Sequence, residues 1–118
     1  MFGSDRLTLI SDAIRPAGLP VGTVSESGGI DVVVRDGAVY LKDSETLAGS
    51  GSTLWHCVCC AVEMGINFDE AVKMATKTPA KLLGVNKGEV KEGFDADLLL
   101  IGENMQIDEI FIAGERYL

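Results

Sequence analysis

The stretch LTLISDAIRPAGL, residues Leu7–Leu19, decides the fold. It begins with an apolar run, Leu7–Ile10, whose branched residues are typical of a buried strand. A carboxylate, Asp12, follows the run, and Pro16 and Gly18 then prevent the strand from continuing. In α/β folds, and above all in the eight-stranded α/β barrel, catalytic residues lie at the carboxyl ends of strands. Asp12 is therefore a candidate catalytic residue; the alternative is that it caps the turn that follows.

The size and charge of the chain limit what it can be. Its 118 residues are 47% hydrophobic, which suffices for one modest domain with a core. A closed (β/α)8 barrel needs on the order of 200 residues or more, so a chain of this length is too short for one. The formal net charge is −8, with 18 acidic and 10 basic residues and no basic cluster, so neither nucleic acid nor an anionic membrane is expected as a partner.

The expected location is the cytoplasm. No apolar run approaches the roughly 20 residues of a membrane span. The first residues, MFGSDR, lack the basic and apolar regions of a secretory signal. The three cysteines, Cys57, Cys59 and Cys60, are too close together within one predicted helix to form disulfides, which agrees with a reducing compartment.

The middle of the chain predicts a β-hairpin. Two β-prone runs, Ile30–Arg35 and Ala38–Leu41, flank the pair Asp36-Gly37, which is the strongest short hairpin signal. The preceding residues, 21–27, are expected to form a loop.

Three helices and two strands are predicted after the hairpin. The first helix, 54–64, is apolar nearly all round and is expected to be mostly buried. The second begins after Asn67 as N-cap, and the third begins at Thr78-Pro79. The strands are expected at 98–101 and 107–112, with Asp95 and Asp97 capping the turn before the first of them.

Three motifs resemble one enzyme family. ISDAIRPAGLP, GGIDVVVRDGAVYL and the LAGS of Leu47–Ser50, with Thr53 behind it, are similar to the carboxyl-terminal third of the N-acetylglucosamine-6-phosphate deacetylases. These enzymes are metal-dependent amidohydrolases, and the resemblance runs from about Asp5 to Gly114. It implies an α/β fold that is a carboxyl-terminal fragment of a (β/α)8 amidohydrolase barrel, with the last barrel strand, the hairpin and two to three helices, plus part of a small β-sandwich. Residues 1–86, including hairpin 30–41, would belong to the catalytic barrel and residues 87–118 to the sandwich.

The resemblance also implies the site residues. Asp12 matches the general acid/base of the family, and Leu47, Ala48 and Gly49 match residues that line the substrate pocket. Small residues let the backbone approach a ligand closely. The amide donors of residues 49–52, at an expected helix start, are also candidates for attracting an anion such as phosphate. The alternative is that LAGS is a simple helix-entry loop.

A divalent metal, zinc or similar, is implied for the full-length enzyme, but none is expected in this chain. Its one histidine, His56, lies in a predicted helix with Cys57 and Cys60. A structural zinc site needs about four ligands, and one helix cannot surround a metal. These three residues are therefore interpreted as packing residues.

The implied reaction is the hydrolysis of N-acetylglucosamine 6-phosphate to acetate and glucosamine 6-phosphate, so an amino-sugar phosphate is the expected substrate. The chain alone is expected to be inactive, because metal ligands and phosphate-binding residues are missing. One alternative is another amidohydrolase, such as a relative of isoaspartyl dipeptidase or dihydroorotase. A second is a non-catalytic α/β domain that associates with itself, since exposed apolar faces favour association; a homo-oligomer is expected in either case.

Overall fold

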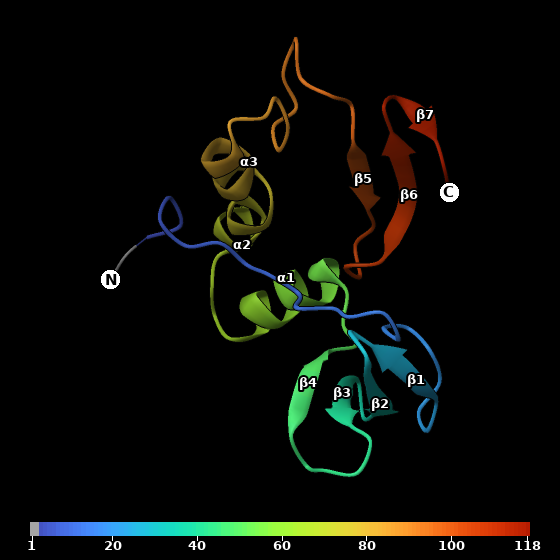
Figure 1. Ribbon diagram of the computed structural model, residues 1–118. Helices are drawn as coiled ribbons and strands as arrows, with labels where there is room; N and C mark the ends of the chain where they lie inside the picture. Colours follow the sequence, from blue (N-terminus) through green and yellow to red (C-terminus); the bar gives the residue numbers. More distant parts are fainter. Residues whose placement is uncertain (1–2) are drawn as a thin grey trace. The chain divides into compact units, whose positions relative to one another are not determined.

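The computed structural model describes residues 3–118, which divide into two compact units, residues 3–9 with Val58–Leu118 and residues Ile10–Cys57. Figure 1 labels the elements of both. In chain order they are β1 (Val24–Ser27), β2 (Ile30–Arg35), β3 (Ala38–Leu41), β4 (Leu47–Ser50), α1 (Leu54–Glu63), α2 (Phe68–Ala75), α3 (Lys77–Leu83), β5 (Leu98–Ile101), β6 (Ile107–Ile112) and β7 (Glu115–Arg116). Among residues 3–118, no helix is both long enough and apolar enough to cross a membrane.

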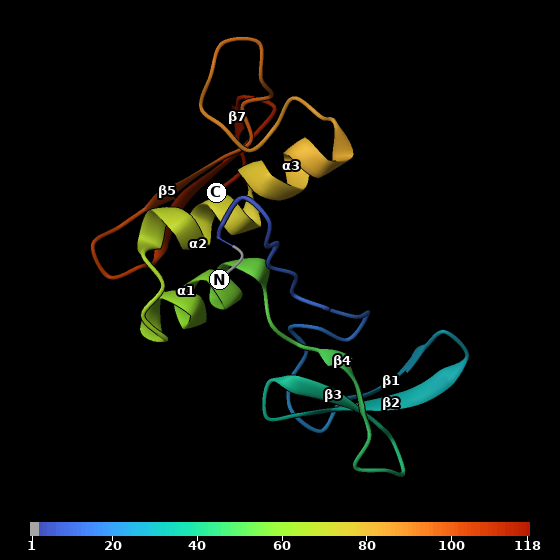
Figure 2. The same ribbon diagram turned by 90° about the vertical axis from the view of Figure 1, so that its left-hand side faces the viewer.

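The Ile10–Cys57 unit contains an antiparallel sheet with the order β1-β2-β3-β4 (Figure 2). The predicted hairpin is confirmed with both strands at the expected residues. Arg35 pairs with Ala38 across the two-residue turn Asp36-Gly37, whose φ angles are 46° and 78°. These left-handed angles match the right-handed twist of the strands, as in a type I′ turn. The sheet buries an apolar face formed by Val32, Val34 and Val39.

The loop predicted at residues 21–27 is partly wrong, because β1 occupies its second half. Ser27 pairs with Ile30 across Gly28-Gly29, which have φ angles of 62° and 83°. Two glycines reach these angles without steric cost, so they close a second hairpin as tight as the first.

Helix α1 begins and ends as its sequence predicts. The Thr53 hydroxyl oxygen accepts a hydrogen bond from the His56 backbone N–H (3.2 Å), which caps the first turn. Gly65, with φ of 92°, lies just beyond the last turn. The expectation that the helix is mostly buried is wrong, since only Val58 and Ala61 are buried on it.

Helices α2 and α3 follow with one shifted boundary. The Asn67 side chain accepts from the Asp69 N–H (3.0 Å), so this predicted N-cap is confirmed. α3 begins at Lys77, ahead of the predicted Thr78-Pro79, because Thr76 already ends α2 and serves as its N-cap residue. Proline is compatible with the first turn of a helix, where its missing N–H has no intrahelical partner.

The predicted strands β5 and β6 are confirmed, and β7 extends them to a three-stranded antiparallel sheet. Ile112 pairs with Glu115 across Ala113-Gly114, whose φ angles are 51° and 82°. This is a third two-residue turn with left-handed angles.

The strand predicted at Leu7–Ile10 is wrong. None of the described strands pairs with it, and Ile10 is 73% exposed. The Leu9 N–H instead donates to the carbonyl of Met74 in α2 (3.0 Å), and the Thr78 hydroxyl donates to the carbonyl of the buried Ser4 (2.8 Å). An apolar run becomes a strand only where a neighbouring strand completes its hydrogen bonds, and residues 3–118 provide no such neighbour here.

Candidate functional site

The candidate acid, Asp12, has a left-handed backbone with φ of 51°. Its side chain is exposed, and within residues 3–118 no hydrogen bond or ion pair engages its carboxylate. A residue other than glycine adopts this conformation only where surrounding contacts impose it, and such residues are concentrated at functional sites.

One local hydrogen bond spans Asp12, from the Ala13 N–H to the Ser11 hydroxyl oxygen (3.3 Å), and two more come from β4, the LAGS segment. Ser50 donates its N–H to the Asp12 carbonyl (2.8 Å), and the Ser50 carbonyl accepts from the Ile14 N–H (3.2 Å). Ala13 thereby forms a parallel bridge to Ser50 and lies beside the edge strand of the sheet. The structure therefore brings together the two segments that the sequence singled out, which lie far apart along the chain.

The three residues expected to line a substrate pocket differ in exposure. Leu47 is 59% exposed, Ala48 is half-buried and Gly49 is buried. They belong to a strand, so the alternative of a simple helix-entry loop is wrong. Strand β4 pairs with β3 through Gly49 opposite Val39 and Leu47 opposite Tyr40, with an irregularity between the two pairs.

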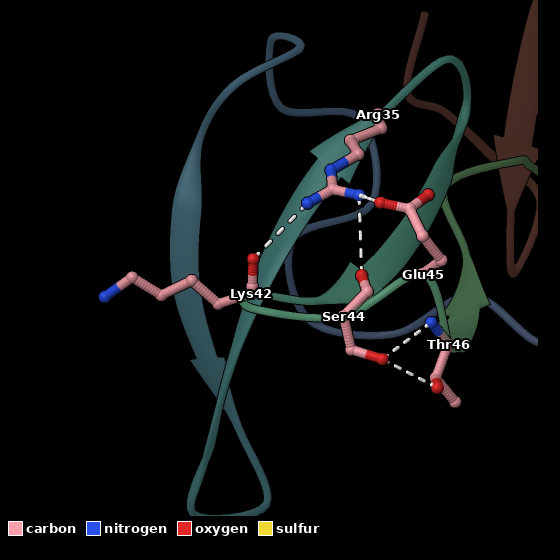
Figure 3. Close-up of polar contacts among 5 residues, drawn as sticks. All are labelled: Arg35, Lys42, Ser44, Glu45 and Thr46. Atoms are coloured by element: carbon pink, nitrogen blue, oxygen red, sulfur yellow. Dashed lines mark hydrogen bonds and ion pairs between the residues drawn. The ribbon is translucent and has the colours of Figure 1, made fainter.

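A network around Arg35 fixes the loop that leads into β4 (Figure 3). Its guanidinium donates to the backbone carbonyls of Lys42 (3.3 Å) and Ser44 (3.4 Å) and forms an ion pair with Glu45 (2.9 Å). The Ser44 hydroxyl contacts both the N–H and the hydroxyl of Thr46, at 3.0 Å and 2.8 Å. Sequence reasoning missed Arg35, because nothing local distinguishes it from any solvated residue at the end of a strand.

The expected anion site at the amides of residues 49–52 is wrong, because the structure uses these donors internally. Besides the Ser50 N–H, the Gly51 N–H donates to the Gly37 carbonyl (3.1 Å). The Ser52 N–H donates to the Ser50 hydroxyl oxygen (2.9 Å). Donors that are already hydrogen-bonded cannot also bind a phosphate without breaking the turn.

The residues present do not fit a metal ion. Among residues 3–118 there is no group of three or more histidine, cysteine, aspartate or glutamate side chains that could hold one. His56 is exposed on α1, while Cys57 and Cys60 are half-buried on the same helix. Zinc sites in proteins take three or four protein ligands, and this helix provides no such set.

Asp95 and Asp97 follow the turn at residues 92–93 and do not cap it, so this expectation is wrong. Both carboxylates form ion pairs with Lys87, at 2.8 Å for Asp95, and Asp97 also accepts from the Ala113 N–H (2.9 Å). Hydrogen bonds to the two carboxylates raise the pKa of Lys87 to about 12. The bonds from Lys87 and from the Ala113 N–H lower the pKa of Asp97. These contacts tie the segment before β5 to the β6–β7 turn.

Comparisons with known proteins agree on one family. The sequence profile of the amidohydrolase family matches residues 7–117. The N-acetylglucosamine-6-phosphate deacetylase of Danio rerio is 32% identical over 113 residues, covering 93% of this chain and 28% of that protein. The N-acetylgalactosamine-6-phosphate deacetylase of Escherichia coli O157:H7 is 33% identical over 114 residues, covering 94% of this chain and 30% of that protein.

A solved structure gives the same result. The N-acetyl-D-glucosamine-6-phosphate deacetylase of Mycobacterium smegmatis, as an aspartate-to-alanine variant in complex with N-acetyl-D-glucosamine-6-phosphate, has a TM-score of 0.87 at 30% identity. The match covers 97% of this chain and 31% of that one. The chain thus spans 28% to 31% of the length of these relatives.

Proposed function

The chain belongs to the amidohydrolase family, and from that premise we propose that it carries the acid–base and sugar-lining part of an N-acetylglucosamine-6-phosphate deacetylase. The observation that carries the proposal is a pair of hydrogen bonds. They join residues 11–14, here called the Asp12 turn, to Ser50 of the LAGS strand. Because of these bonds, an exposed carboxylate lies on the same sheet edge as the residues expected to meet the substrate.

Asp12 is the proton carrier of this reaction. Hydrolysis of an acetamide takes a proton from the attacking water and gives one to the leaving nitrogen. The Asp12 carboxylate accepts the proton as the water oxygen bonds to the carbonyl carbon. It then donates this proton to the nitrogen as the carbon–nitrogen bond breaks, which yields acetate and glucosamine 6-phosphate. Support comes from the exposed carboxylate, whose oxygens are engaged by no other group among residues 3–118.

Leu47 and Ala48 are proposed to meet the sugar and its acetamide. Both lie on the strand that contacts the Asp12 turn, and the side chain of Leu47 is exposed. An exposed leucine on that strand provides an apolar contact for the acetyl methyl group.

Amidohydrolases are generally metal-dependent, whereas the described residues of this chain do not fit a metal ion. No step of the proposed reaction is therefore assigned to a metal ion.

In the same proposal, residues 3–86 correspond to part of the family's (β/α)8 barrel and 87–118 to strands of its small β-sandwich. A cytoplasmic location and self-association of the chain also belong to the proposal. Light scattering on the purified chain tests the last point, and a defined oligomer is expected because several large apolar side chains are exposed.

A chimeric enzyme tests the proposed function. The 118 residues replace the matching stretch of the Mycobacterium smegmatis deacetylase, and acetate release from N-acetylglucosamine 6-phosphate is measured. The chimera is expected to release acetate. The relative without the stretch, and the 118-residue chain alone with added zinc, manganese or iron, are expected to be inactive.

The same assay separates the alternatives. N-acetylgalactosamine 6-phosphate and an isoaspartyl dipeptide serve as further substrates, and turnover of the dipeptide in place of both sugars would assign the chain to a different amidohydrolase. A folded chimera that turns over none of the three substrates would contradict the proposed function and favour a non-catalytic domain.

A further inference from the structure

We propose that Gly49 and Ser50 are positioning residues that hold the Asp12 carboxylate in place through the backbone, and that Gly49 does not act by contacting substrate. This inference rests on the proposed function, because it concerns the residues that support its acid.

Ser50 forms two hydrogen bonds with the backbone on the carboxyl side of Asp12. Its N–H binds the Asp12 carbonyl (2.8 Å) and its carbonyl binds the Ile14 N–H (3.2 Å). These two bonds flank Ala13, so the backbone on the carboxyl side of Asp12 cannot rotate without breaking one of them. The placement of the Asp12 backbone, and with it the point from which the carboxylate projects, is therefore tied to the position of β4.

Gly49 allows this close approach. A Cβ at Gly49 would lie 2.8 Å from Ile14 Cγ2 and 3.1 Å from the Asp12 carbonyl oxygen. Its φ angle lies outside the left-handed region, so an alanine would suit the backbone at this position. The requirement for glycine is therefore steric, and it comes from the Asp12 turn itself. Gly49 is also buried, which leaves little of it to touch a ligand.

The other neighbours of β4 make it a firm support. A Cβ at Gly51 would lie 2.9 Å from the Gly37 carbonyl oxygen, and the Gly51 N–H donates to that oxygen (3.1 Å). Gly49 itself pairs with Val39, which is fully buried in the sheet. The Asp12 turn is thus connected through one strand to the β2–β3 hairpin.

This arrangement predicts a particular kinetic effect. A displaced acid slows proton transfer in bound substrate, and a misplacement of 1 Å can cost about 10²-fold in rate. A residue that touches substrate in the ground state and the transition state alike affects KM instead. The two roles of Gly49 can therefore be separated by the split between kcat and KM.

The first test uses amide hydrogen exchange in the 118-residue chain, followed by NMR. The Ser50 and Ile14 amides are expected to be protected in the unchanged chain. Gly49→Ala is expected to remove their protection while the β1–β2 ladder stays protected. The matched control is Gly102→Ala, where the atoms nearest to a Cβ would belong to the flexible carboxylate of Asp108 (2.8 Å), and it should leave Ser50 and Ile14 protected.

A compensating variant keeps the test decisive. Ile14→Ala removes the side-chain atoms that a Cβ at position 49 would meet, so Gly49→Ala/Ile14→Ala is expected to regain protection at Ser50. If Gly49→Ala unfolds the sheet, recovery of the fold and of Ser50 protection in the double variant supports the inference. Failure to recover overturns it, as does full protection of Ser50 and Ile14 in Gly49→Ala.

The second test uses the chimeric enzyme. Gly49→Ala is expected to lower kcat by about 10²-fold with KM unchanged, and Ile14→Ala should restore part of kcat. A raised KM with unchanged kcat would overturn the inference and return Gly49 to the substrate pocket. An inactive chimera before any substitution would count against the proposed function alone, since the exchange experiment still decides the geometry.

Discussion

Asp12 and Asp36 have nearly the same backbone conformation, with φ of 51° and 46°, but their surroundings differ. Asp36 is followed by Gly37 in a two-residue turn, where the hairpin itself demands left-handed angles at both positions. Asp12 is followed by Ala13, and its conformation is held by Ser50 from a distant part of the chain. One aspartate thus serves a turn, whereas the other is held in an unfavourable conformation that no turn requires.

Under the proposed function, this difference separates a catalytic aspartate from one that only serves a turn. Strain at Asp36 is the ordinary cost of a tight hairpin, and asparagine or glycine would suit that turn equally well. The left-handed angle at Asp12 is accompanied by hydrogen bonds to Ser11 and to Ser50 of β4, and the Asp12 carboxylate is exposed.

Conversion of each aspartate to asparagine gives the largest expected contrast. In the chimeric enzyme, Asp12→Asn removes the proton acceptor and is expected to lower kcat by about 10²- to 10⁴-fold, the usual contribution of general acid–base catalysis. Asp36→Asn suits a type I′ turn and should leave kcat unchanged. Steady-state acetate release measures both, and equal losses in the two variants would mean that Asp12 has no special role.

Substitution by valine tests whether the backbone strain is the same at both sites. A β-branched residue is poorly tolerated at left-handed angles, so Asp12→Val and Asp36→Val are each expected to lower the free energy of unfolding by about 1–2 kcal/mol. Asp12→Gly and Asp36→Gly, the matched variants, should each change it by less than about 1 kcal/mol, because relief of strain opposes the added entropy of the unfolded chain. Urea unfolding measures all four variants. A neutral Asp12→Val would show that Ser50 does not enforce the conformation.

The same contrast explains what the sequence could predict. The β2–β3 hairpin follows from the local pair Asp36-Gly37, and the sequence predicts both of its strands to the residue. The β1–β2 hairpin carried a comparable signal in Gly28-Gly29, but VSES before it is too polar to stand out as a strand.

The errors involve contacts between distant residues. LAGS has small residues and no β-branched one, so only its pairing with β3 and Ala13 makes it a strand. Leu7–Ile10 has the opposite character: its composition favours a strand, but no described partner completes it. Asp12 was identified as the candidate acid from the resemblance and from its place after an apolar run. The hydrogen bonds from Ser50 to Asp12 and Ile14 join residues far apart along the chain, so no local sequence pattern predicts them.

The Arg35 side chain supports the hairpin region through three partners, whereas the segment around Asp12 has one side-chain support, the Ser11 hydroxyl that accepts from the Ala13 N–H (3.3 Å). Arg35→Met keeps much of the apolar stem but removes bonds to two backbone carbonyls and to Glu45, so a loss of about 1 kcal/mol in the free energy of unfolding is expected. Glu45→Gln removes only an ion pair whose carboxylate is 92% exposed, and should cost about 0.2–0.5 kcal/mol. Urea unfolding of both variants tests this order, and equal losses would mean that the ion pair outweighs the carbonyl contacts.

Substitution of Asp97 is expected to have the smallest effect on stability. This residue contacts the β6–β7 turn, Ala113-Gly114, which also has left-handed angles. It accepts the N–H of Ala113, whose φ is 51°, and this bond together with Lys87 lowers the pKa of Asp97 below its ordinary value of 3.8. A lowered folded-state pKa means that the contribution to stability is present above pH 3.8 and is lost as the pH falls through the folded pKa. Asp97→Asn should therefore flatten the acid side of the stability profile, as followed by urea midpoints from pH 5 to pH 2. Asp95→Asn is the matched control, because Asp95 contacts Lys87 but not Ala113. An equal effect of the two would assign the shift to Lys87 alone, and the Ala113-Gly114 turn would then depend on the bond from the Gly114 N–H to the Ala96 carbonyl (2.9 Å).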